Sequence, residues 1–357
     1  MSEDGRQKIM RQLGEITAQL SHLRFSTISS LVEDEQPGAY KVEECLLPSF
    51  IWFRREELEE LDRGPFHDER DYFDSLFTAY INHFESLDAP QHLLLGPRPE
   101  TCEYNSWASY AAASDRANDF VAVGIKMDHS KNRFAFCLAG QLMKDMTPQL
   151  ISGGEGFPLH HPDLHTGNIF VDDDLNVTCI IDWASASTVP SAEHLITPCV
   201  PSSALVHKQT AIAAFRQGYQ SKTGVVDGET WKRADMMWRV QKMVRMHSAG
   251  DYHHFQALCA LASPDGTANV LDLLHQKAQK GDNRNLLNEL AEGDLDKEQL
   301  REREQSCFGT KSDATEKRAV ARKLTIAYEM NPRFLADVKL WRWLENALRK
   351  DDASADS

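Results

Sequence analysis

The chain has 357 residues, of which 41% are hydrophobic and 26% are charged, as expected for a globular protein with a sizeable core. Its 54 acidic residues outnumber the 39 basic ones, and the formal net charge of −15 argues against a nucleic-acid or anionic-membrane surface while it is compatible with a cationic small-molecule acceptor. Because the sequence has no run of 18 apolar residues, no signal-peptide apolar region and no C-x-x-C among its seven scattered cysteines, we expect a cytoplasmic protein with reduced thiols.

The residues before position 150 predict mainly helices. Apolar residues recur at spacings of four, three, four and three along the first predicted helix: Ile9, Leu13, Ile16, Leu20 and Leu23. A second helix, from Asp68 to Leu87, would carry Phe73, Phe77, Tyr80, Phe84 and Leu87 on one face. Residues 37–53 are predicted to be extended and broken by Pro48, and residues 108–147 again predict helices.

The pattern changes at Gly153 and Gly154. Two short β-branched runs, 168–171 and 177–182, flank a turn-rich tip and predict a β-hairpin. A loop from Pro190 to about residue 206 then precedes helices expected over 207–221, 230–248, 251–262, 267–279, 284–292, 296–305, 313–329 and 332–349. Without a repeat or a low-complexity linker, the sequence predicts one α+β, mostly helical domain over residues 1–350, with a disordered tail over 351–357.

The stretch 157–183 contains the residues with the clearest chemistry. Asp163 would lie on a loop that Pro162 keeps from being helical, Asn168 begins the first hairpin strand, and Asp182 ends the second. Their oxygen-bearing side chains are therefore expected to converge at one end of the hairpin. Phosphoryl transfer from a nucleotide needs a carboxylate near the attacking hydroxyl and oxygen ligands for Mg²⁺, and these three residues would supply both.

The same stretch resembles the catalytic core of the aminoglycoside phosphotransferase family, whose pattern is roughly H-x-D-L-H-x-G-N followed by I-D-W. That family is similar to protein kinases in fold and includes choline kinase-like relatives. The match rests on six positions within eight residues: His161, Asp163, Leu164, His165, Gly167 and Asn168. The opening QKIMRQLGEITAQLSHLRF and the late ARKLTIAYEMNPRFLADVKLWRWLENAL resemble a fungal branch of the family, so the resemblance covers nearly the whole chain as a C-terminal lobe.

The resemblance implies that a phosphoryl group passes from ATP, with Mg²⁺, to a hydroxyl of a small molecule. Asp163 would be the catalytic base, His161 would brace its loop, and Asn168 and Asp182 would be the Mg²⁺ ligands. The helical extension over residues 207–350 would complete the lobe. The family usually carries an acidic residue after the Asp-Trp pair, where this chain has Ala184.

The parts that clamp ATP in such enzymes do not appear before this stretch. The seven glycines of residues 1–150 never cluster into a glycine-rich loop. Lys126, in the run VAVGIK, superficially resembles the lysine of a kinase strand, but we interpret it as a solvated helix lysine. Since the helix near Gln7 follows the hinge in the resembling family, we expect the N-terminal lobe to be absent and ATP turnover by this chain alone to be weak or missing.

Two other functions fit the sequence. The chain is alternatively a non-catalytic pseudokinase or a binding module that retains the C-terminal lobe, and a partner protein would then bind at the face left by the missing lobe. A candidate apolar stripe consists of Met236, Met237, Val240, Met243 and Val244, although a core helix explains it more simply. A zinc site at His160, His161 and His165 is disfavoured, because Pro162 prevents a helical face.

Overall fold

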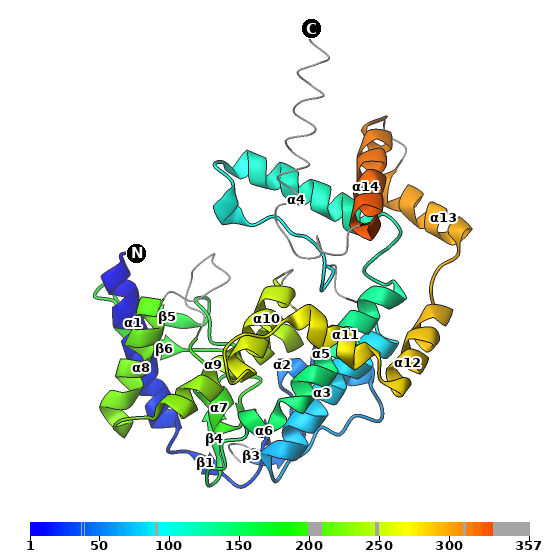
Figure 1. Cartoon of the computed structure of the whole chain (residues 1–357). Helices are drawn as coiled ribbons and strands as arrows, with labels where there is room; N and C mark the ends of the chain where they lie inside the picture. The colour runs from blue at the N-terminus through cyan, green and yellow to red at the C-terminus, as the bar shows by residue number, and fades with distance from the viewer. Residues whose placement is uncertain are drawn as a thin grey trace. The chain divides into compact units, whose positions relative to one another are not determined.

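The computed structural model describes residues 1–36, 38, 40–89, 92–198, 209–246, 250–309 and 312–330 (Figure 1). The fold is α+β and about 59% helical, with a small antiparallel sheet, which confirms the predicted mostly helical α+β class. The chain forms two compact units: residues 1–83 with 139–270, and residues 84–138 with those from 271 onward. The single domain over residues 1–350 stays a prediction, and the helix predicted over 332–349 and the tail over 351–357 lie outside the described residues.

Helices make up most of the described elements. The α-helices are α1 (Glu3–Leu20), α2 (Pro48–Ile51), α3 (Glu69–Ser86), α4 (Trp107–Ala122), α5 (Ser130–Asp145), α6 (Thr147–Leu150), α7 (Ser191–His194), α8 (Gln209–Thr223), α9 (Gly228–Val244), α10 (Asp251–Ala262), α11 (Val270–Ala278), α12 (Gly281–Glu292), α13 (Lys297–Phe308) and α14 (Ser312–Met330). Two 3₁₀ turns are η1 (Trp52–Glu57) and η2 (Thr101–Glu103). The strands are β1 (Arg24–Phe25), β2 (Ser29–Glu33), β3 (Tyr40–Glu43), β4 (Phe157–His160), β5 (Ile169–Val171), β6 (Val177–Ile180) and β7 (Ser187–Thr188).

Most predicted helices are confirmed, and three predicted segments need correction. Residues 37–53 are not extended throughout: among those that the structure describes, β3 is the one strand, and Pro48 begins α2 because its fixed φ suits a first helical turn. Leu23 lies beyond the end of α1 and is 50% exposed. The predicted loop after Pro190 begins with the single turn α7.

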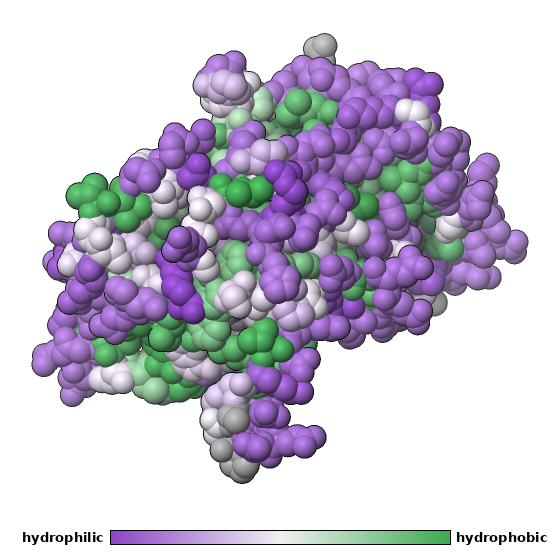
Figure 2. Space-filling model, turned by 90° about the horizontal axis from the view of Figure 1, so that it is seen from below, coloured by the Kyte–Doolittle hydropathy of each residue, from purple (hydrophilic) through white to green (hydrophobic). Residues whose placement is uncertain are grey.

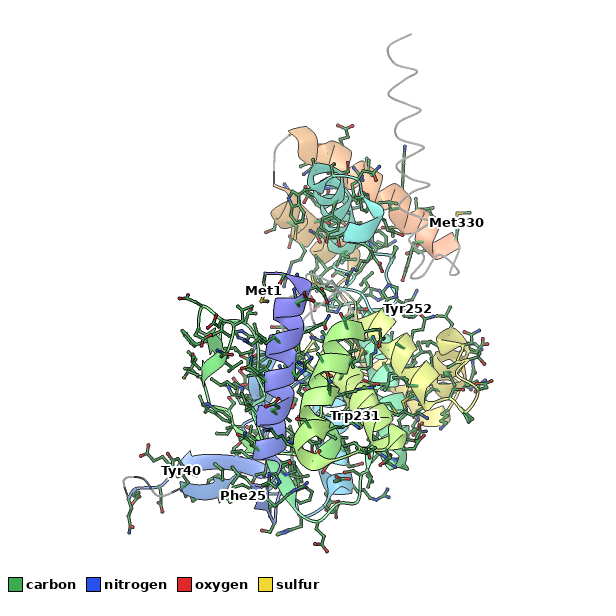
Figure 3. All side chains as sticks on the ribbon, turned by 90° about the vertical axis from the view of Figure 1, so that its left-hand side faces the viewer. Met1, Phe25, Tyr40, Trp231, Tyr252 and Met330 are labelled. Carbon is green, nitrogen blue, oxygen red and sulfur yellow. The ribbon has the colours of Figure 1, made fainter. Side chains whose placement is uncertain are left out.

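Two neighbouring strands of the five-stranded sheet, β4 and β7, hold residues 161–186 at both ends. Its strands follow the order β1-β4-β7-β2-β3, and every pair is antiparallel. In the β4–β7 pair, Leu159 lies opposite Thr188 and His160 lies opposite Ser187. Residues 161–186 therefore leave one strand and return to its neighbour, with the separate hairpin of β5 and β6 between. Tyr40 marks the hairpin of β2 and β3 at the sheet edge (Figure 3).

Helices α1 and α8 lie side by side and touch backbone to backbone (Figures 1 and 3). A Cβ added to Gly218 would lie 1.9 Å from the carbonyl oxygen of Arg11, and one added to Gly14 would lie 2.1 Å from that of Phe215. Only glycine fits at both positions. Around this crossing, Leu13, Phe215 and other apolar side chains form a buried cluster.

Helix α1 also holds the hairpin of β5 and β6 through its polar side chains. Gln12 donates from Nε2 to the Leu175 carbonyl at 2.9 Å and accepts at Oε1 from the Val177 N–H at 2.9 Å. Lys8 donates from Nζ to the Asp174 carbonyl at 2.7 Å. The tip of the hairpin is therefore fixed to a helix that is itself locked against α8.

The second unit is helical where it is described. Phe120 of α4 packs against Leu324 and Tyr328 of α14. Asp294 caps the start of α5, because its carboxylate accepts from the Ser130 N–H at 2.7 Å and from the Ser130 hydroxyl at 2.6 Å. None of the residues predicted for the phosphoryl-transfer site lies in this unit.

We predict that Gly218→Ala destabilises the protein and that Gly228→Ala does not. The new methyl group at position 218 would overlap a backbone carbonyl, so the helices must separate, at a cost of roughly 1–3 kcal/mol. Gly228 at the start of α9 has nothing within 4 Å of its missing Cβ, which makes it the matched control. Urea unfolding would measure both variants, and equal midpoints would contradict the close approach.

Candidate phosphoryl-acceptor site

His161 braces the loop that follows β4. Its side chain is buried, and its Nε2 lies 2.9 Å from the carbonyl oxygen of Ile181, while its Nδ1 accepts from the Asp163 N–H at 3.3 Å. These two bonds fit an imidazole whose proton is on Nε2. The Trp183 ring packs edge-on against the imidazole, with centroids 4.7 Å apart. His161 thus joins the loop to the end of the hairpin.

Asn168 closes the same loop from its other end. Its side chain is buried, and its Nδ2 donates to the Asp163 carbonyl at 2.9 Å. Its own carbonyl accepts from the Ile181 N–H at 3.0 Å. Because the amide nitrogen is already committed, Oδ1 is the atom of this side chain that can bind a metal ion.

Asp182 lies directly after Ile181, the residue that bonds to both His161 and Asn168. Its φ of 65° is in the left-handed region, which few residues other than glycine adopt, and its side chain is exposed. The backbone therefore turns sharply where the hairpin ends. Hydrogen bonds through Ile181 and Asn168 place the backbones of Asp163, Asn168 and Asp182 near one end of the hairpin, and the convergence of their side chains stays a prediction.

The donor atoms at this end fit Mg²⁺ better than zinc. In the described part of the chain, no three His, Cys, Asp or Glu side chains come together in a way that would hold a metal ion. An amide oxygen from Asn168 and a carboxylate from Asp182 are hard ligands, and Mg²⁺ often takes only one or two protein carboxylates, with phosphate oxygens completing its octahedron. His161 and His165 are engaged within the loop: Nδ1 of His165 accepts from the Gly167 N–H at 2.9 Å.

Asp163 borders a cavity of about 270 Å³ within the first unit. The Asp163 side chain is 37% exposed, and one of its oxygens lies 3.4 Å from Nε2 of His165. The walls come from the end of α1, from β4 and its loop, from α7 with the residues after it, and from α9. Asp163 therefore lines a concave space large enough for a small molecule.

Helix α9 and its C-terminal residue supply four polar or aromatic side chains to this cavity, which the sequence analysis missed: Trp238, Gln241, Lys242 and Arg245. Trp238 and Lys242 are four residues apart, as are Gln241 and Arg245, so all four lie on one helical face, a signal hidden by the stronger apolar stripe of the same helix. Arg245 donates through one Nη to the Pro162 carbonyl and through Nε to Oε1 of Gln241 at 3.2 Å. Burial lowers the pKa of Arg245, while the nearby carboxylates of Glu193 and Asp163 raise it.

Behind the cavity, Glu193 is a fully enclosed acid. Its two carboxylate oxygens accept from the Tyr72 hydroxyl and from Nε2 of Gln241, each at 2.6 Å. Burial raises the pKa of Glu193 to about 7, against the opposing effects of the Tyr72 hydrogen bond and the Arg245 charge. Glu193 and Gln241 thus connect α3, α7 and α9 beneath the loop that carries Asp163.

Two histidines of the cavity wall are held uncharged. Burial is the main cause that lowers the pKa of His160 well below its ordinary value, and nearby His194 and Arg245 lower it further. Burial also lowers the pKa of His194 to about 4, and its Nε2 lies 3.0 Å from the Thr17 carbonyl oxygen. Neither imidazole adds positive charge to the cavity near neutral pH.

Lys126 is not the solvated helix lysine that the sequence suggested. It lies in a turn after α4 and is partly buried, with its Nζ 2.6 Å from the Phe120 carbonyl oxygen and bonded to the Val123 carbonyl as well. Its ammonium group also lies over the Phe120 ring, 4.5 Å from the centroid. Burial lowers the pKa of Lys126 to about 8. This lysine closes the C-terminal end of a helix, where free carbonyls attract a cation.

The apolar stripe of α9 is part of the core and not a docking surface. Met236, Met237, Val240, Met243 and Val244 are all buried. On the face shown in Figure 2, hydrophobic residues form separate patches between hydrophilic ones.

Within the described residues, no helix combines the length and the apolar character needed to cross a membrane.

No family model, no curated protein and no solved structure matches the chain. The functional assignment therefore rests on the residues of this site and on their geometry.

We predict that Glu193→Gln changes how stability depends on pH. An acid whose pKa is higher in the folded than in the unfolded state makes the fold less stable as pH rises from about 4.5 to 7. The wild-type chain should therefore lose on the order of 3 kcal/mol relative to Glu193→Gln between pH 4.5 and 8. Urea unfolding across this range would measure the difference, with the exposed Glu155→Gln as control. Parallel curves for all three proteins would contradict the raised pKa.

Proposed function

We propose that the loop and hairpin of residues 157–183 form the acceptor side of a Mg²⁺-dependent phosphotransferase site that acts on a hydroxyl of a small molecule. The observation that carries the proposal is the position of the Asp163 carboxylate. Asp163 lines a half-open cavity, while its loop is tied through His161 and Asn168 to the residue before Asp182. A base beside an acceptor pocket, with metal-ligating oxygens next to it, is the arrangement that phosphoryl transfer needs.

In this proposal Asp163 orients the acceptor hydroxyl and takes its proton. The hydroxyl oxygen then forms a bond to the γ-phosphorus of ATP, and the bond from that phosphorus to the β–γ bridging oxygen breaks, so that ADP leaves. The hydrogen bonds to the Asp163 backbone keep the loop from drifting as the proton moves. A fixed base contributes through position as well as through basicity.

Asn168 and Asp182 would hold Mg²⁺ through Oδ1 and a carboxylate oxygen. The ion supplies charge neutralisation for the phosphate oxygens when it is bound. The protein's part is to hold both residues at the end of one hairpin, where the hydrogen bond from the Ile181 N–H to the Asn168 carbonyl joins the two strands. The sharp turn at Asp182 presents its side chain to solvent at this end.

A second candidate function uses the same cavity but involves no phosphoryl transfer. The run VAVGIK ends in Lys126, which superficially resembles the lysine of a kinase strand. Its ammonium is bonded to two backbone carbonyls at the end of α4. The ammonium of this lysine is therefore engaged in holding the end of α4. A pseudokinase or binding module would use the cavity beside Asp163 for recognition only.

We predict that Asp163→Asn lowers phosphoryl transfer by about 10²–10⁴-fold, the usual contribution of a general base. The amide keeps the shape of the side chain but cannot take the proton. Transfer from labelled ATP to a panel of small alcohols would be followed in single-turnover reactions with protein in excess, since turnover is expected to be slow. Asp173→Asn at the exposed hairpin tip is the matched control. Equal rates for the two variants would remove Asp163 from the mechanism, and a complete lack of transfer by the wild-type chain would favour the binding module.

We predict separately that Asp182→Asn weakens the binding of Mg²⁺·ATP and leaves the melting temperature without ligand unchanged, because the side chain is exposed. Isothermal titration would compare the variant and wild type with and without a chelator. Chelation should weaken nucleotide binding by the wild type more than by the variant. If chelation has the same effect on both proteins, Asp182 is not a metal ligand.

A further inference from the structure

The charge of the cavity beside Asp163 differs from the charge of the chain. Among the described residues that line it, Asp163 is the one carboxylate, whereas Lys242 and Arg245 are cations. His160 and His194 are neutral near pH 7, because burial lowers the pKa of each. If Asp163 faces the acceptor hydroxyl, the rest of the acceptor meets positive charge.

Lys242 has the geometry of a ligand contact. Its ammonium nitrogen lies 5.4 Å from the centroid of the Trp238 ring, and no carboxylate of the described residues pairs with it. A cation over an indole face is held in place without being neutralised. Its N–H donors therefore stay available to an anion in the cavity.

Arg245 stands one helical turn further along the same face. Its Nε and one Nη bind Gln241 and the Pro162 carbonyl, so the guanidinium is fixed in orientation. The remaining nitrogen carries two more N–H groups. A guanidinium held in this way is suited to a carboxylate or a phosphate group, which it can meet with little further loss of side-chain freedom.

The cavity is also small. Its volume of about 270 Å³ is just below the range of about 300–1,000 Å³ found for most small-molecule pockets. A compact acceptor fits such a space better than a multi-ring compound. An amine or a quaternary ammonium group would be placed close to two like charges, which is unfavourable where water is partly excluded.

We propose that this cavity selects a small hydroxy acid, whose hydroxyl faces Asp163 and whose carboxylate or phosphate group is bound by Lys242 and Arg245. The inference rests on the proposed function and narrows its acceptor class. It also reverses the expectation of a cationic acceptor that the net charge of the chain suggested.

Binding by the full chain tests the inference without requiring turnover. Isothermal titration would compare two anionic alcohols, glycerate and glycerol 3-phosphate, with neutral glycerol and cationic choline. The anionic probes should bind more tightly than glycerol, and choline should bind most weakly. Tighter binding of choline than of both anions, or no binding of either anion at about 10 mM, would overturn the proposal.

Variants of Lys242 then locate the anion. Lys242→Gln should weaken binding of the anionic probe by about 10- to 100-fold, and Lys242→Arg should restore most of it. Lys232→Gln on the same helix is the matched control, because Lys232 does not line the cavity. Equal effects at both positions would overturn the assignment. A Lys242→Gln variant that loses affinity for Mg²⁺·ATP but keeps its affinity for glycerate would also overturn the assignment, because Lys242 would then bind the nucleotide.

The two proposals fail in different ways. If the anionic probes bind through Lys242 but no phosphoryl transfer to them occurs, the proposed phosphotransferase function is wrong and the anion pocket remains. If transfer to choline or glycerol occurs and the anions do not bind, the hydroxy-acid inference is wrong and the phosphotransferase function remains.

Discussion

The site depends on the hydrogen bond from the Arg245 guanidinium to the Pro162 carbonyl. Pro162 has no N–H, so its carbonyl is the only backbone group through which this point of the loop can be held. A hydrogen bond from a charged donor is worth about 1.5–3 kcal/mol, more than a neutral one. Through this bond the end of α9 sets the position of the residue next to Asp163.

The end of α9 is in turn fixed by Arg55, a fully buried arginine of η1. Its Nη1 donates to the Val244 carbonyl at 2.8 Å and to the Ser49 carbonyl at 2.7 Å. Burial lowers the pKa of Arg55 to about 10, which still leaves it charged at neutral pH. Burying a charge is costly, and the two charge-assisted hydrogen bonds from Nη1 to backbone carbonyls offset part of that cost. The carbonyl at position 244 belongs to the residue before Arg245, so the two arginines act in series on the loop.

The residues of this site that can be predicted from the sequence lie close to one another along the chain. Asp163, Asn168 and Asp182 come together because one hairpin returns the chain to its starting point within 20 residues. The sheet was missed because β1 and β7 have two residues each, too few to show an alternating pattern, and their partners lie far away in the chain. Lys242 and Arg245 were missed for another reason. Helical periodicity marks the buried face of α9 but does not tell which of the remaining faces lines a cavity.

Net charge and local charge lead to opposite expectations for this chain, and the local charge is the relevant one for a ligand. The value of −15 sums groups spread over the whole surface, while charges more than about 8 Å apart in solvent are largely screened at physiological salt. A molecule in the cavity meets Asp163, Lys242 and Arg245 at short range and in partly dehydrated surroundings, where each charge has a stronger effect. Glu193 is buried behind Gln241 with its pKa raised to about 7, so near neutral pH it is only partly ionised. The acidic surface therefore favours solubility, and the cavity keeps a positive wall opposite its base.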